Sequence, residues 1–132
     1  MTKYLNVDLE LESKANLSPL AEYFSERALV LFNGRVGRRH RLVIEIHDAP
    51  SRRSSHAADQ CIQSLIELIT PLPVPLRDLW DACTARVFDI GFESGVCPRP
   101  YEEHLSEQTI TLVASFGGAV RLSLYPVDPS DD

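Results

Sequence analysis

The chain has 132 residues, of which 44% are hydrophobic and 24% are charged. These proportions predict one globular domain, and they exclude a coiled coil, a collagen-like repeat and a wholly disordered chain. We place this domain, of the α+β class by the order of elements given below, at 1–127, and expect an acidic disordered tail at 128–132. The formal net charge of −6 argues against nucleic-acid binding over the whole surface, and no apolar run approaches the roughly eighteen residues of a membrane span.

The N-terminal segment predicts a strand followed by a short helix. Residues 4–12 alternate between apolar and polar side chains, as expected of a half-buried strand. Its apolar face is expected to carry four residues: Leu5, Val7, Leu9 and Leu11. Ser18 as the N-cap and Pro19 as the first helical residue predict a short helix that ends near Arg27.

The next segment predicts a hairpin and then a longer helix. Two apolar, β-branched runs at 28–32 and 42–46 flank a polar stretch at 33–39 that contains two glycines. This pattern indicates a β-hairpin whose turn occupies the polar stretch. Apolar residues then recur at helical spacing from Ala58 to Ile69, which indicates a helix packed against the core.

The C-terminal half predicts two helices and two strands. A short amphipathic helix is expected over 76–83, and alternation over 86–93 indicates a strand with its bulky apolar residues toward the core. Ser106 is expected to cap a last helix that ends at Gly117, before a final strand at 120–124. Three residues of this helix are expected to face the core: Ile110, Val113 and Phe116.

This order of elements predicts an α+β fold. We expect a largely antiparallel sheet of about five strands, in the order strand, helix, strand, strand, helix, helix, strand, helix, strand, with ferredoxin-like layering and helices on one face. The other sheet face would then be open to solvent or to a partner. The polar residues expected on this open face are Asn6, Asp8, Glu10, Glu45, His47, Asp89, Glu93, Arg121 and Tyr125.

The carboxylates of the open face permit more than one interpretation. Polar residues at alternate strand positions face water in many half-exposed sheets without any further role. We favour a non-enzymatic domain that binds a basic protein partner through this face, because complementary charge steers association, or a homodimer that pairs at a sheet edge. Alternatively, a small enzyme or ligand-binding domain would place Asp8, Asp89, His47 and Tyr125 around a shallow polar pocket.

A basic segment runs from Arg35 to Arg53. Its six arginines are Arg35, Arg38, Arg39, Arg41, Arg52 and Arg53. This segment would suit a phosphate or a nucleic acid, but no aromatic residue is interleaved for base stacking and no nucleic-acid-binding motif is present. Solvated loop charge is therefore the preferred interpretation of the segment.

Neither a metal, a cofactor nor a catalytic cysteine is predicted. The spacing of Cys97 and His104 matches no zinc motif. Cys61 and Cys83 lie on the apolar stripes of their helices, where a cysteine is usually a small buried hydrophobe. The N-terminus lacks the basic and then apolar pattern of a signal peptide, so we expect a cytoplasmic protein with free thiols.

Four segments resemble a family of uncharacterised bacterial proteins. They carry the patterns YLNxDL, LWxxCT, FDIG and LxLYP, at 4–9, 79–84, 88–91 and 122–126. The family has no established activity, so this resemblance implies no mechanism. In layout the chain is also similar to small α+β immunity proteins of bacterial toxin systems, whose acidic surfaces cover basic toxin active sites. That similarity implies the same acidic binding face.

Overall fold

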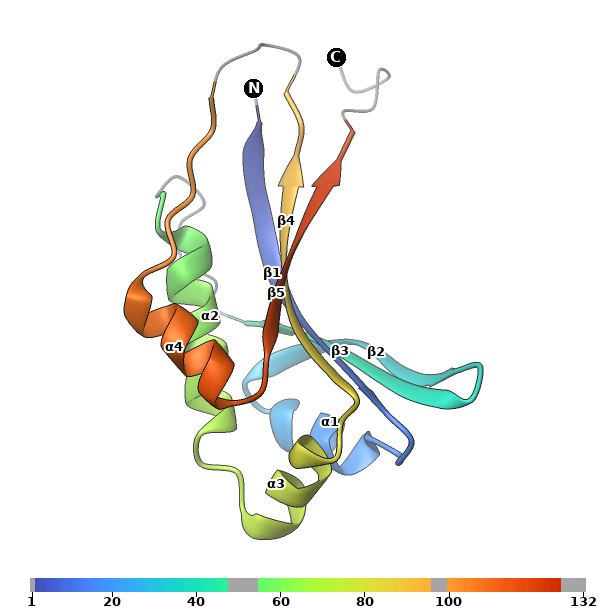
Figure 1. The fold of residues 1–132 in the computed structure, drawn as a ribbon. Coiled ribbons are helices and arrows are strands. Elements are labelled where there is room, and N and C mark those ends of the chain that lie inside the picture. The colour runs from blue at the N-terminus through green and yellow to red at the C-terminus, as the bar shows by residue number, and fades with distance from the viewer. Residues whose placement is uncertain (1, 48–54, 96–99, 127–132) are drawn as a thin grey trace.

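The computed structural model describes residues 2–47, 55–95 and 100–126 (Figure 1). In these ranges the elements are β1 (Lys3–Ser13), α1 (Ser18–Phe24), β2 (Ala28–Val36), β3 (Arg39–Ile46), α2 (Ala57–Ile69), α3 (Val74–Asp81), β4 (Ala85–Glu93), α4 (Glu107–Ser115) and β5 (Ala119–Tyr125). Arg52, Arg53, Cys97 and the expected tail at 128–132 lie outside the described residues. Within the described part, no helix is long and apolar enough to cross a membrane.

The strands form one five-stranded sheet in the order β2-β3-β1-β4-β5. The central strand, β1, runs antiparallel to β3 and β4, and β2 and β3 form an antiparallel hairpin. The edge strand β5 runs parallel to β4 because the chain returns along the sheet through α4 before entering β5 (Figure 1). The α+β class with a largely antiparallel sheet is therefore confirmed, with one parallel pair.

The core lies between one face of the sheet and the helices. Val7, Leu9 and Leu11 alternate along β1 toward this side and are buried with residues from all four helices in a single apolar cluster. Trp80 of α3 is fully buried, and its Nε1 donates a hydrogen bond to the carbonyl of Phe116 at 3.1 Å. This one-sided burial leaves the opposite sheet face free of helices.

A β-bulge corrects the expected alternation at the start of β1. The register shifts between Tyr4 and Asn6, so that Leu5 has no directly opposite residue on β4. An extra residue in one strand reverses the faces of the residues that precede it. As a result Tyr4, with 3% of its surface exposed, takes the core position expected for Leu5, which is only half-buried.

The hairpin is longer than the sequence predicts and its turn is shorter. β2 continues to Val36 and β3 begins at Arg39, which leaves a two-residue turn. Gly37 has φ of 64°, the left-handed conformation that a tight hairpin turn requires. The polar residues of 33–36 belong to the strand because their partners on β3 continue the ladder, and ladder pairing does not require apolar side chains.

Two helix boundaries also differ from the prediction. The N-cap of α1 is Leu17 and not Ser18, whose amide instead donates to Asn16 Oδ1 at 2.9 Å, and the helix ends at Phe24. Pro19 lies in the first turn as expected. Arg27 follows the helix and leads into β2.

The last helix confirms its predicted caps but not all of its predicted core residues. Ser106 Oγ accepts a hydrogen bond from the amide of Thr109 at 3.1 Å, and Gly117 follows the helix with φ of 72°. Val113 is buried as expected, but Ile110 is 54% exposed. The buried face runs through Thr109 and Val113, one helical turn apart, so Ile110 faces outward.

Candidate functional site

The strand register places three carboxylates in one row across the open face. Glu45 of β3 and Asp89 of β4 lie directly opposite Asp8 of β1, one on each side. Arg121 of β5 continues the row beyond Asp89. Directly opposite residues in a sheet have Cβ atoms about 5 Å apart, so these side chains form one electrostatic unit.

Two arginines neutralise part of this acidic face. Glu10 lies between them: its Oε1 is 3.0 Å from Arg41 Nη2 and its Oε2 is 2.7 Å from Arg121 Nη2. Arg121 also contacts Asp89 Oδ2 at 3.2 Å, and Ser123 Oγ donates to Asp89 Oδ1 at 2.6 Å. Hydrogen bonds to Asp89 and Glu10 raise the pKa of Arg121, which keeps its guanidinium charged.

Asp8 and Glu45 receive no such compensation. Asn6 Nδ2 donates to Asp8 Oδ1 at 3.3 Å and to Glu45 Oε2 at 3.2 Å, and neither carboxylate forms an ion pair within 2–47, 55–95 and 100–126. Burial and the charges of Glu45, Asp89 and Glu10 raise the pKa of Asp8 to about 6, against a smaller opposing effect of Arg121. The negative charge of this pair is therefore available to a cation from outside.

The remaining predicted open-face residues are not brought together in one site. Glu93 is 3.7 Å from Lys3 Nζ. A Cβ added at Gly91 would lie 3.5 Å from Tyr125 Cε2 and 3.0 Å from Asn6 Oδ1, so these two side chains converge over the glycine. His47 lines a separate cavity of about 260 Å³ with Glu26 and Glu67.

The open face is shallow. Its cavity beside Glu10, Arg41 and Arg121 has a volume of about 120 Å³. Small-molecule pockets usually enclose about 300–1,000 Å³. Among the described residues, no three His, Cys, Asp or Glu side chains are placed to hold a metal ion. The cavity beside Glu10 is therefore smaller than the usual small-molecule pocket.

The basic segment does not form one cluster in its described part. Arg41 faces Glu10 on the open face, with its guanidinium carbon 6.0 Å from the centre of the Phe32 ring. Arg35 and Arg38 are exposed near the tip of the hairpin. Arg39 Nη1 is buried and has no hydrogen-bond partner in the described part of the chain. Arg41 is thus paired with the acidic face, apart from Arg35 and Arg38 near the hairpin tip.

The two described cysteines are buried, unpaired thiols. Cys61 and Cys83 belong to the apolar core cluster. Burial raises the pKa of Cys61, and it raises that of Cys83 to about 11. Both thiols stay protonated at neutral pH, so neither has the thiolate character that a nucleophile needs.

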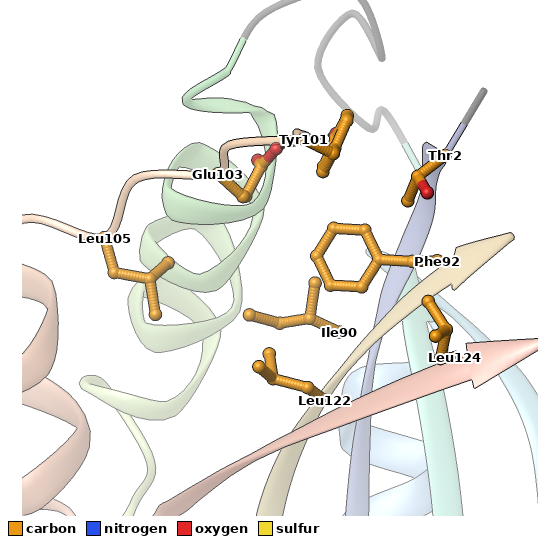
Figure 2. A pocket seen from close by; sticks show the side chains of 8 residues that line it. All are labelled: Thr2, Ile90, Phe92, Tyr101, Glu103, Leu105, Leu122 and Leu124. Carbon is orange, nitrogen blue, oxygen red and sulfur yellow. Dashed lines mark hydrogen bonds between the residues drawn. The ribbon is translucent and has the colours of Figure 1, made fainter. Parts of the chain in front are cut away.

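An apolar pocket on the helix side of the sheet was not anticipated from the sequence (Figure 2). It has a volume of about 520 Å³ and is lined by Thr2, Ile90, Phe92, Tyr101, Glu103, Leu105, Leu122 and Leu124. Figure 2 shows Leu105 and Glu103 across the opening from Ile90 and Leu122. Leu122 and Leu124 are 69% and 66% exposed although they face the helix side of the sheet, because no helix covers this end of β5.

The polar groups at the edge of the pocket are already hydrogen-bonded. Glu103 Oε1 accepts from the amide of Ala58, in the first turn of α2, at 2.8 Å. Tyr101 Oη donates to Glu103 Oε2 at 2.9 Å. Alternation of Leu122 and Leu124 indicates an inward-facing strand, but no sequence signal reports whether a helix will cover that strand.

Comparisons of the chain with protein-family models, with curated proteins and with solved structures gave no match. The resemblance of the four sequence segments and the similarity to immunity proteins therefore stay predictions.

Proposed function

We propose that this domain is a protein-interaction module that binds a basic protein surface through its open sheet face. The observation that carries the proposal is the adjacent pair Asp8 and Glu45, which shares one asparagine amide and has no ion-pair partner in the described structure. An immunity-like role, in which the acidic face covers the basic site of a toxin, is one form of this function.

A lysine or arginine of the partner is the group that this pair would bind best. A cation placed between the two carboxylates would compensate the negative charge that burial and neighbouring acids now make unfavourable. It would therefore favour the ionised form of Asp8. The flanking ion pairs of Glu10 and Asp89 hold Arg41 and Arg121 aside, so these cations do not satisfy Asp8. Acidic charge around the pair would also speed encounter with a basic surface.

A defined cationic probe tests the proposal. Binding of a rhodamine-labelled oligolysine peptide is measured by fluorescence anisotropy for the unmodified protein and for the double variant Asp8→Asn, Glu45→Gln. We expect the double variant to weaken binding by about tenfold or more, with a gain in affinity for the unmodified protein as salt falls. The matched control is Glu22→Gln, which removes a carboxylate from the exposed side of α1.

The control removes one charge and the double variant removes two, so a loss of binding free energy in Glu22→Gln that is half of the loss in the double variant would show that only net charge matters. Unchanged binding in the double variant would show that Asp8 and Glu45 do not form the binding site. Asp89 is not the residue to substitute first. It is buried and bound to Arg121 and Ser123, so its loss would disturb the ion pairs of the whole face.

The apolar pocket favours a second candidate function, the binding of a compact apolar group. Its volume of about 520 Å³ falls in the usual range for ligand pockets, and Leu122 and Leu124 remain exposed at its edge. The neutral fluorescent probe N-phenyl-1-naphthylamine tests this function. Enhanced emission that is lost in Leu122→Asp and kept in Ile110→Asp, an exposed apolar residue of α4, would support it; equal loss in both variants would refute it.

A further inference from the structure

The outer edge of the sheet at β2 is apolar and is not covered by another described strand. Residues 29–32 are four consecutive apolar residues, and each is between 38% and 50% exposed. β2 is an edge strand of nine residues, so one side of its backbone has no partner strand among the described residues. Folded proteins usually block such edges with lysine, proline, a β-bulge or a very short strand. β2 is long and contains neither lysine nor proline, and its one device of this kind is the bulge between Val30 and Phe32.

A bulge in β2 determines which antiparallel pairings of two copies are possible. The register shifts between Val30 and Phe32, with the result that Leu29 lies opposite Glu45 and Phe32 opposite Val43. Both partners belong to the open face, so Leu29 and Phe32 share a face although they are three residues apart. Directly opposite residues of paired strands must share a face. A symmetric pairing that spans the bulge must therefore place an even-numbered residue of one copy opposite an odd-numbered residue of the other.

One of these registers also matches the charges at both ends of the strand. When Val30 lies opposite Leu31 of a second copy, Leu29 lies opposite Phe32. The same offset, extended beyond the first residue of β2 at Ala28, brings Glu26 of the preceding turn beside Arg35. Glu26 and Arg35 are exposed, and neither forms an ion pair in the described structure. A slip of two residues either way places Arg35 opposite Ala28 or Phe24 and removes both ion pairs.

We propose that β2 pairs antiparallel with β2 of a second copy of this chain, in the register that brings Glu26 beside Arg35. The two-fold symmetry forms this ion pair twice, once at each end of the apolar centre. The two sheets then continue into one another, and their open faces lie on the same side. A dimer of this kind would present the Asp8 row twice, for a partner with two basic patches or for two partners.

Sedimentation equilibrium of the full chain over a concentration series tests the proposal. We expect a species of twice the chain mass that dissociates on dilution. Glu26→Arg or Arg35→Glu alone should weaken the dimer by about tenfold, because each places like charges together at both ends of the interface. The combined exchange Glu26→Arg with Arg35→Glu should restore the affinity to within about threefold of the unmodified protein.

Two further variants locate the interface. Leu31→Lys, at the centre of the proposed strand pair, should give a monomer with an unchanged circular dichroism spectrum. Leu122→Lys, which replaces an exposed leucine on the other edge strand, should leave the dimer intact. A monomer at every concentration, a dimer lost only in Leu122→Lys, or failure of the charge exchange to restore association would each overturn the proposal.

Discussion

The uncompensated charge of Asp8 predicts that removing it stabilises the fold. In Asp8→Asn the carbonyl oxygen still accepts the hydrogen bond that Asn6 donates to Oδ1, and the negative charge beside Glu45 and Asp89 is lost. The pKa of Asp8 rises from 3.8 to about 6 on folding, and each pKa unit corresponds to about 1.4 kcal/mol, so the upper bound is about 3 kcal/mol. Asp8 is partly exposed, and solvent screening lowers the expected gain to about 1–1.5 kcal/mol.

The raised pKa of Asp8 determines how the stabilisation in Asp8→Asn depends on pH. Because the folded pKa lies above the unfolded one, the folded state retains a proton between pH 4 and pH 6 that the unfolded chain has released. The contribution of Asp8 to the free energy of unfolding should therefore fall as pH rises through this window, and its unfavourable effect should be constant above the window. Asp8→Asn should be more stable than the unmodified protein at pH 8 and equal to it near pH 4.

Urea unfolding followed by tryptophan fluorescence at pH 4, 6 and 8 measures this difference, since Trp80 is buried in the core. Glu22→Gln is the control and should show no comparable change with pH. A variant that is less stable at pH 8, or a stability difference that does not shrink toward pH 4, would refute the assignment of uncompensated charge to Asp8. A gain in stability together with weaker oligolysine binding would identify Asp8 as a residue kept for binding at the expense of stability.

Four core and backbone substitutions have expected costs in urea unfolding. Unfolding of Trp80→Phe is followed by circular dichroism, because Trp80 is the only tryptophan of the chain. Trp80→Phe should lower the free energy of unfolding by about 2–3 kcal/mol, because it leaves a void and an unsatisfied carbonyl at Phe116. Gly37→Ala should cost about 1 kcal/mol from its φ of 64° alone. Gly117→Ala should cost more, because its added Cβ would also lie 2.7 Å from a guanidinium nitrogen, and equal costs would contradict that contact. Ser106→Ala should cost about 1 kcal/mol through loss of the α4 N-cap, and no change would show that the cap is dispensable.

The acidic face and the proposed β2 interface are adjacent. Leu29 of β2 lies directly opposite Glu45, and Phe32 lies beside Arg41. Association through β2 would lower the exposure of this side of the face and strengthen the charge interactions there. We therefore expect Leu31→Lys to weaken oligolysine binding moderately, and to a smaller extent than the double variant at Asp8 and Glu45. A loss as large as in the double variant would mean that the acidic face depends on the dimer.

Alternation along the chain predicted five strands and, apart from the bulge at Leu5, the two faces of the central strand. Asp8, Glu10, Glu45 and Asp89 were expected on the side away from the helices, and the strand register places them there. The periodicity of α2 and the caps of α4 were also predictable, because both follow from contacts within a few residues. Helix periodicity and helix caps can be predicted because they depend on residues that are close together in the sequence.

Only the tertiary structure decided which charges are neutralised and which apolar residues are covered. Arg41 and Arg121 come from strands on opposite sides of β1, and their meeting at Glu10 depends on strand order and register, which single-strand periodicity does not contain. The same holds for Leu122, which alternates like a core residue but lies beyond the reach of the helices. Which charges pair, and which strand residues a helix covers, depend on segments that are far apart in the sequence. The uncompensated charge of Asp8 and the apolar sheet edges therefore became visible only in the folded chain.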